Sequence, residues 1–74
     1  MNTFPKRYVV ENIKNNFPVG CRVQLDCMND PYQNIPVGTQ GTVKFVDDIG
    51  TIHVAWDCGS SLGIVYGEDS CHRI

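Results

Sequence analysis

Four carboxylates form two acidic runs, and together they are the first candidates for chemistry in this chain. Asp47 and Asp48 are adjacent, as are Glu68 and Asp69. Clustered carboxylates can bind a divalent cation, but a calcium loop needs a ligand at about every second residue, and neither run provides one. We therefore expect no metal site. The two runs are predicted to form an acidic rim that is solvated or pairs with three basic residues of the N-terminal segment, Lys6, Arg7 and Lys14.

The cysteines are the next candidates, because thiolates bind zinc and act as nucleophiles. Cys21, Cys27, Cys58 and Cys71 leave gaps of 5, 30 and 12 residues, so no C-x2-C pair typical of zinc sites is present. Cys27 alternates with apolar residues and is predicted to lie in the core, whereas Cys58 falls in a turn and is predicted to be exposed. We expect free thiols rather than disulfides.

The histidines lack the sequence context of a catalytic base. His53 is predicted to be an exposed strand residue flanked by Lys44 and Ser61 on the neighbouring strands. With these neighbours, His53 has no acidic side chain to orient its ring and no nucleophile beside it. His72 follows Cys71 but completes no ligand pattern. The sequence therefore predicts no catalytic residue, no cofactor and no enzymatic activity.

A binding surface is the remaining possibility, and polar residues at the loop ends are its candidates. Tyr32 can stack on a base or a peptide side chain, and the serine hydroxyls can hold an anion. The loop 29–39 and the hairpin 57–59 are expected to share one end of the fold, opposite the hairpin 47–50 and the turn 67–69. Alternatively, these residues only shape turns. The candidate binding residues are Asp30, Tyr32, Asp57, Ser60 and Ser61.

Short alternating strands must position all these residues. Between residues 38 and 67, apolar side chains alternate in three runs, and glycines mark the hairpins at Gly50 and Gly59. Expected strands span 21–28, 40–46, 51–56, 60–66 and 70–74, and a helix spans 5–16, where Pro5 favours its start. The prediction is a mainly β single domain over residues 1–74. Its expected architecture is a five-stranded antiparallel SH3-like barrel over residues 21–74, preceded by one helix.

Composition limits the functions that such a domain can have. The chain has 74 residues, enough for one small domain with little volume for an internal active site. Residues 1–22 carry a net charge of +3, but residues 23–69 carry −6, which opposes binding to phosphate backbones. No apolar run is long enough for a membrane span, and the N-terminus does not resemble a secretion signal. We expect a cytoplasmic protein.

Several sequence motifs occur together in a specific order. They are PVGTQGTV at 36–43, VDDIGTIHVAWD at 46–57, GSSLG at 59–63 and GED at 67–69. In this combination the chain resembles an uncharacterised family of small bacterial, plasmid and phage proteins that is known only as a domain of unknown function. The resemblance implies an SH3-like barrel and a frequent place on mobile elements. It implies no activity and no catalytic residues.

Three functions are compatible with these observations. The first is a non-enzymatic protein-binding module. Its narrower version is a phage or mobile-element inhibitor of a bacterial defence protein, in which acidity imitates nucleic acid. The alternative is an oligomer that binds a small nucleotide signal between subunits, because one small barrel lacks a deep pocket. A further alternative is an RNA- or DNA-binding barrel, which the fold permits and the charge opposes.

Overall fold

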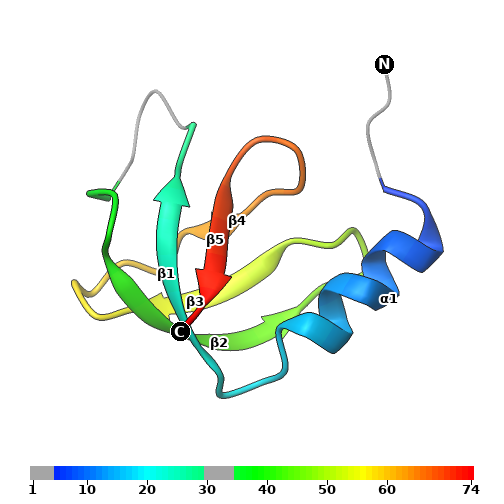
Figure 1. Cartoon of the computed structure of the whole chain (residues 1–74), viewed down its shortest axis with the longest axis horizontal. Coiled ribbons are helices and arrows are strands. Elements are labelled where there is room, and N and C mark those ends of the chain that lie inside the picture. Colours follow the sequence, from blue (N-terminus) through cyan, green and yellow to red (C-terminus); the bar gives the residue numbers. More distant parts are fainter. Residues whose placement is uncertain (1–4, 30–34) are drawn as a thin grey trace.

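The structure is a computed structural model that describes residues 5–29 and 35–74. These residues form one helix followed by five antiparallel strands. Helix α1 (Arg7–Asn16) precedes β1 (Arg22–Cys27), β2 (Gln40–Val46), β3 (Ile52–Trp56), β4 (Gly63–Ile64) and β5 (Ser70–Arg73). The strands form one open sheet in the order β4-β3-β2-β1-β5 (Figure 1). The predicted mainly β class is therefore confirmed, while the narrower SH3-like barrel stays a prediction.

The core lies on one face of this sheet and comes mostly from alternating strand residues. Val23, Leu25, Val43 and Val54 have no exposed surface, and Trp56 is 3% exposed. In β3 the burial follows the predicted period of two, because successive side chains of a strand point to opposite faces.

Two bulges reverse the predicted direction of side chains in β1 and β2. The pairing of β2 with β3 shifts between Val43 and Phe45, so Phe45 is 48% exposed instead of buried beside Val43. The pairing of β1 with β5 shifts between Leu25 and Cys27 in the same way, and Cys27 is exposed rather than part of the core. A bulge adds one unpaired residue to a strand, so the residues beyond it change face.

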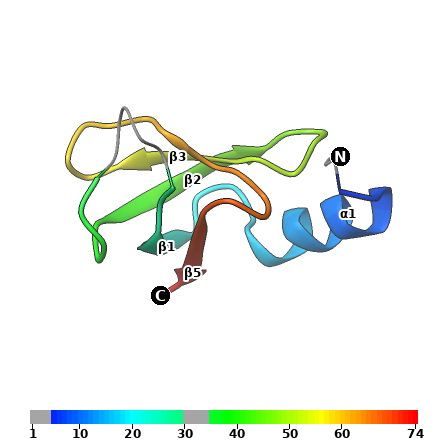
Figure 2. The same ribbon diagram turned by 90° about the horizontal axis from the view of Figure 1, so that it is seen from above.

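Helix α1 lies beside the β2–β3 hairpin rather than over the face of the sheet (Figures 1 and 2). It ends at the predicted residue, Asn16, and begins two residues after the predicted start. Gly50 makes close packing possible, because a Cβ there would lie 3.3 Å from both Ile13 and Pro5. Its φ of +83° also requires glycine.

The strand β4 is much shorter than the predicted strand 60–66. Side chains replace its ladder: the Leu62 N–H donates to Ser60 Oγ at 3.2 Å, and the Leu62 carbonyl accepts from Trp56 Nε1 at 2.8 Å. Ile64 is buried as expected, but Tyr66 is 49% exposed. The Trp56 backbone N–H also donates to the Ser60 carbonyl at 3.0 Å, so Trp56 holds this edge through both its main chain and its indole.

Within residues 5–29 and 35–74, no helix combines the length and the apolar character needed to cross a membrane.

Candidate binding groove

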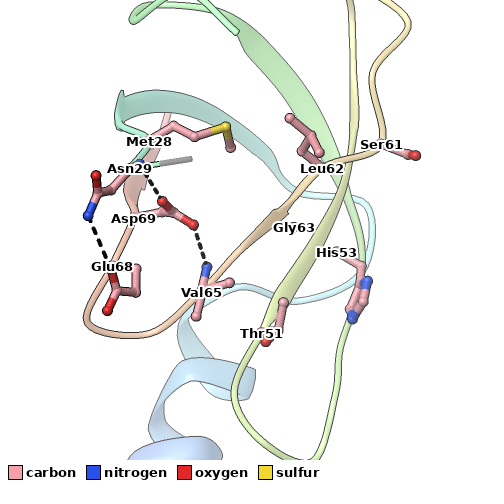
Figure 3. Close-up of a pocket in the computed structure, with 10 residues that line it drawn as sticks. All are labelled: Met28, Asn29, Thr51, His53, Ser61, Leu62, Gly63, Val65, Glu68 and Asp69. Atoms are coloured by element: carbon pink, nitrogen blue, oxygen red, sulfur yellow. Dashed lines mark hydrogen bonds between the residues drawn. The ribbon is translucent and has the colours of Figure 1, made fainter. Parts of the chain in front are cut away.

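A shallow groove of about 440 Å³ lies between the β3–β4 edge and the turn that leads into β5 (Figure 3). Its apolar floor includes Met28, Leu62 and Val65, and we call this hollow the acidic groove because Glu68 and Asp69 stand on its rim. Gly63 contributes to the hollow shape, because its missing side chain leaves space beside Thr51. The groove is open, so it suits a segment of a larger molecule better than an enclosed small ligand.

Hydrogen bonds hold both rim carboxylates in place. Asp69 Oδ1 accepts the backbone N–H of Asn29 at 2.7 Å, and Asp69 Oδ2 accepts the N–H of Val65 at 3.0 Å. The Asn29 side-chain amide donates to Glu68 Oε1 at 3.2 Å (Figure 3). These contacts correct the expected arrangement, in which the loop beginning at Asn29 and the turn 67–69 lay at opposite ends. The two segments meet because β5 runs antiparallel beside β1.

The rim carboxylates differ from the others in the described part of the chain. Five carboxylates there contact a basic side chain within 4 Å, whereas Glu68 and Asp69 contact none. The five pairs are Glu11 with Arg7, Asp26 with His72, Asp47 with His53, Asp48 with Lys14, and Asp57 with Arg22. Lysine or arginine pairs with three of these carboxylates and histidine with two, so among residues 5–29 and 35–74 Glu68 and Asp69 are the aspartate and glutamate side chains without any basic partner.

A histidine with an acidic partner forms another part of the groove wall. His53 Nε2 lies 2.8 Å from Asp47 Oδ2, and its ring stacks on Phe45 with centroids 4.3 Å apart. Desolvation opposes ionisation of Asp47, but hydrogen bonds from His53 and from the N–H groups of Thr51 and Ile49 outweigh it and lower the pKa of Asp47. The carboxylate is thus held ionised while it closes the hairpin.

This pair corrects the expectation of an unoriented His53 between Lys44 and Ser61. The bulge in β2 places Phe45 rather than Lys44 opposite His53. A signal for the pair exists in the sequence: an acid at the start of the hairpin turn 47–50 and a histidine on the strand that follows it. In the described residues no hydrogen bond joins the imidazole to a nucleophilic side chain, and its hydrogen bond with Asp47 fixes the hairpin to β3.

The three predicted binding residues that the structure describes, Asp57, Ser60 and Ser61, have different contacts. Ser61 lines the acidic groove, whereas Ser60 uses its hydroxyl to accept the Leu62 N–H. Asp57 forms a two-pronged ion pair with Arg22, which lowers the pKa of Asp57 and raises that of Arg22. Asp30 and Tyr32 lie outside the described residues.

The four carboxylates of the predicted acidic rim are also divided. Glu68 and Asp69 stand at the groove, Asp47 is engaged in the hairpin, and Asp48 pairs with Lys14 of α1 at 3.2 Å. Within residues 5–29 and 35–74, no three histidine, cysteine, aspartate or glutamate side chains are grouped so that they could hold a metal ion.

The thiols are free and differ in environment. Cys27 and Cys58 are exposed, while Cys21 and Cys71 are half-buried against the core. Burial raises the pKa of Cys71 to about 11, and the nearby Asp26 and Cys21 add to the effect. Cys71 is therefore a protonated, weakly reactive thiol at neutral pH.

The family comparison covers the helix, every strand and the described groove residues. A family model described as "Domain of unknown function (DUF4314)" matches residues 6–74. The chain belongs to the DUF4314 family. No curated protein matches it. Because the match includes Met28 through Asp69, the acidic groove is a feature of the DUF4314 domain in this chain and not of an appended segment.

Proposed function

We propose that this DUF4314 protein is a non-enzymatic protein-binding module whose acidic groove takes a partner segment with a basic side chain. One observation carries the proposal: the two carboxylates that contact no basic side chain in the described residues both stand over an apolar floor. A lysine or arginine suits this arrangement, because its aliphatic stem can cover Met28 and Val65 while its charge faces the rim.

The energetics favour a selective but moderate interaction. An exposed ion pair contributes about 0.2–1 kcal/mol, so the rim alone gives little affinity. Burial of the apolar floor adds about 25 cal/mol for each Å² removed from water. Fixed carboxylates add selectivity, since Asn29 and Val65 already hold the Asp69 side chain in its position. An acidic or neutral segment would leave these charges desolvated and unpaired.

The test is a titration of the ¹⁵N-labelled protein with the peptide acetyl-Gly-Leu-Lys-Leu-Lys-Gly-amide, followed by NMR. We expect shifts at Leu62, Gly63, Val65 and Glu68. Glu68→Lys should weaken binding about threefold to tenfold, because it replaces one attraction with a repulsion. Asp26→Lys is the matched control: it changes the net charge equally, but its carboxylate pairs with His72. Equal weakening by both variants would show non-specific charge attraction and contradict the proposal.

The narrower proposal is that the chain inhibits a bacterial defence protein. Its acidic groove would bind the basic surface with which that protein binds nucleic acid. The acidity of residues 23–69 supports it. The measurement is capture from a bacterial lysate with the wild-type chain and with Glu68→Lys as baits. A protein that is retained by wild type, lost with Glu68→Lys and displaced by a DNA duplex would support inhibition by imitation of nucleic acid. If no concentration of the DNA duplex displaces the captured protein, this narrower proposal is contradicted.

A further inference from the structure

A second hollow lies on the other side of the Val65–Asp69 turn, between α1 and the ends of β4 and β5. Its volume is about 270 Å³, and we call it the apolar hollow. Its floor is formed by core residues, Ile52 and Ile64, which are 6% and 3% exposed. Ile13 and Phe17 contribute one wall, so the hollow joins the helix to the sheet.

The local chain path explains why this hollow stays open. Strand β4 ends at Ile64, and the chain then turns away through Gly67, which has a φ of +85° and no side chain to cover the core. Helix α1 packs over Gly50 at the adjacent hairpin and leaves Phe17 only partly buried. Tyr66 borders the hollow while 49% exposed. The core residues Ile52 and Ile64 thus line a hollow that is open to solvent.

Asp69 connects the two hollows, because it lines both of them. Its side chain is fixed by the N–H groups of Asn29 and Val65, and it contacts no basic side chain in the described part of the molecule. A fixed negative charge therefore stands between an apolar hollow and an apolar-floored groove. A partner that fills both must present apolar surface on either side of a positive charge.

We infer that the apolar hollow receives a bulky apolar side chain from the same partner segment whose basic residue faces the acidic groove. This rests on the proposed function and specifies the partner: its recognition unit is a large apolar residue close to a lysine or arginine. Charge selects a partner segment over a second copy of this chain, because the copy has a net charge of −2. Apolar residues in well-packed pockets usually dominate interface energy, so the hollow should supply most of the affinity.

Three peptides test the inference by NMR titration. They are acetyl-Gly-Leu-Lys-Leu-Lys-Gly-amide, its serine analogue with both leucines replaced, and its glutamate analogue with both lysines replaced. The leucine–lysine peptide should shift Ile64, Tyr66 and Cys71 in addition to the groove residues. It should bind about tenfold more tightly than the serine analogue, since burial of one leucine side chain is sufficient for this ratio.

Two variants localise the effect. Ser70 is exposed on β5 and borders the hollow, so Ser70→Leu should fill it and reduce binding of the leucine–lysine peptide to that of the serine analogue. Ala55→Leu adds the same side chain at an exposed position of β3 that borders neither hollow, and should bind as wild type does. The ¹⁵N spectrum of each variant reports its fold. If Ser70→Leu does not fold, the difference in affinity between the leucine–lysine peptide and its serine analogue for the wild-type protein still tests the inference.

The possible results separate the two proposals. Groove shifts with equal binding of the leucine and serine peptides would overturn the inference and leave the proposed function standing. Equal binding of the lysine and glutamate peptides would overturn both, because charge would then select nothing. Shifts at Tyr66 and Cys71 that grow with protein concentration in the absence of peptide would identify a second copy as the occupant and overturn the inference.

Discussion

Asp47 and Asp48 are adjacent carboxylates with different surroundings, and truncating each to alanine tests how the hairpin is held. Asp47 Oδ1 accepts the N–H groups of Ile49 at 3.1 Å and Thr51 at 2.9 Å, while Oδ2 bonds His53 at 2.8 Å. The Asp48 side chain is fully exposed and contacts Lys14 at 3.2 Å. The same chemical change therefore removes three hydrogen bonds, two of them partly buried, in one variant and one exposed ion pair in the other.

The expected loss of stability follows from these contacts. A net hydrogen bond contributes about 0.5–1.5 kcal/mol, and partial exposure places these three toward the lower end. Asp47→Ala should therefore lower the free energy of unfolding by about 2 kcal/mol, which corresponds to a Tm decrease of roughly 10 °C in a domain of this size. Asp48→Ala should cost less than about 0.5 kcal/mol.

Urea unfolding followed by circular dichroism measures both values, and pH gives an independent check. Because the pKa of Asp47 is lowered in the folded state, its stabilisation is fully present above the ordinary carboxyl pKa, about 3.9. It is lost as the pH falls through the lower folded value. The stability gap between wild type and Asp47→Ala should shrink on acidification. Equal losses in the two variants at neutral pH, or an unchanged gap in strong acid, would refute the reasoning.

Two further changes test the core and the thiols. Gly41→Ala should lower the free energy of unfolding, measured in urea, by about 1–3 kcal/mol, because a Cβ at this position would lie 2.6 Å from Val54 Cγ1. A variant as stable as wild type would contradict this close approach. Iodoacetamide at neutral pH should modify exposed Cys27 and Cys58 well before Cys71, whose pKa is raised to about 11, as mass spectrometry of digested protein would show. Equal rates at the three thiols would contradict the assigned burial.

The sequence predicts this fold well where local rules decide the structure. The second strand has the predicted bounds, Gln40–Val46, and β3 buries the expected alternate residues. The alternation fails beyond each bulge, at Phe45 and Cys27. The position of a bulge depends on how two strands pair and not on the sequence of either strand alone. The shortness of β4 is also non-local, since the indole of Trp56 replaces part of its ladder.

The candidate site was less predictable than the fold. The sequence singles out Ser61, Glu68 and Asp69, but assigns them to opposite ends of the molecule. The contact of Glu68 and Asp69 with Asn29 depends on β5 pairing with β1, the last strand of the chain with the first. Which carboxylates remain without a basic partner also depends on tertiary contacts, as the pair of Asp48 with Lys14 shows. Charge counting alone therefore predicts the acidity of the surface but not its location.

The hydrogen bond from Trp56 to Leu62 gives this small domain an intrinsic optical reporter. Trp56 is the single tryptophan of the chain, it is 3% exposed, and its indole N–H ends on a residue of the groove floor. An occupant that moves Leu62 alters the polarity and hydrogen bonding of the indole, and hence its emission. Occupation of the groove can thus be followed by the fluorescence of the unlabelled protein.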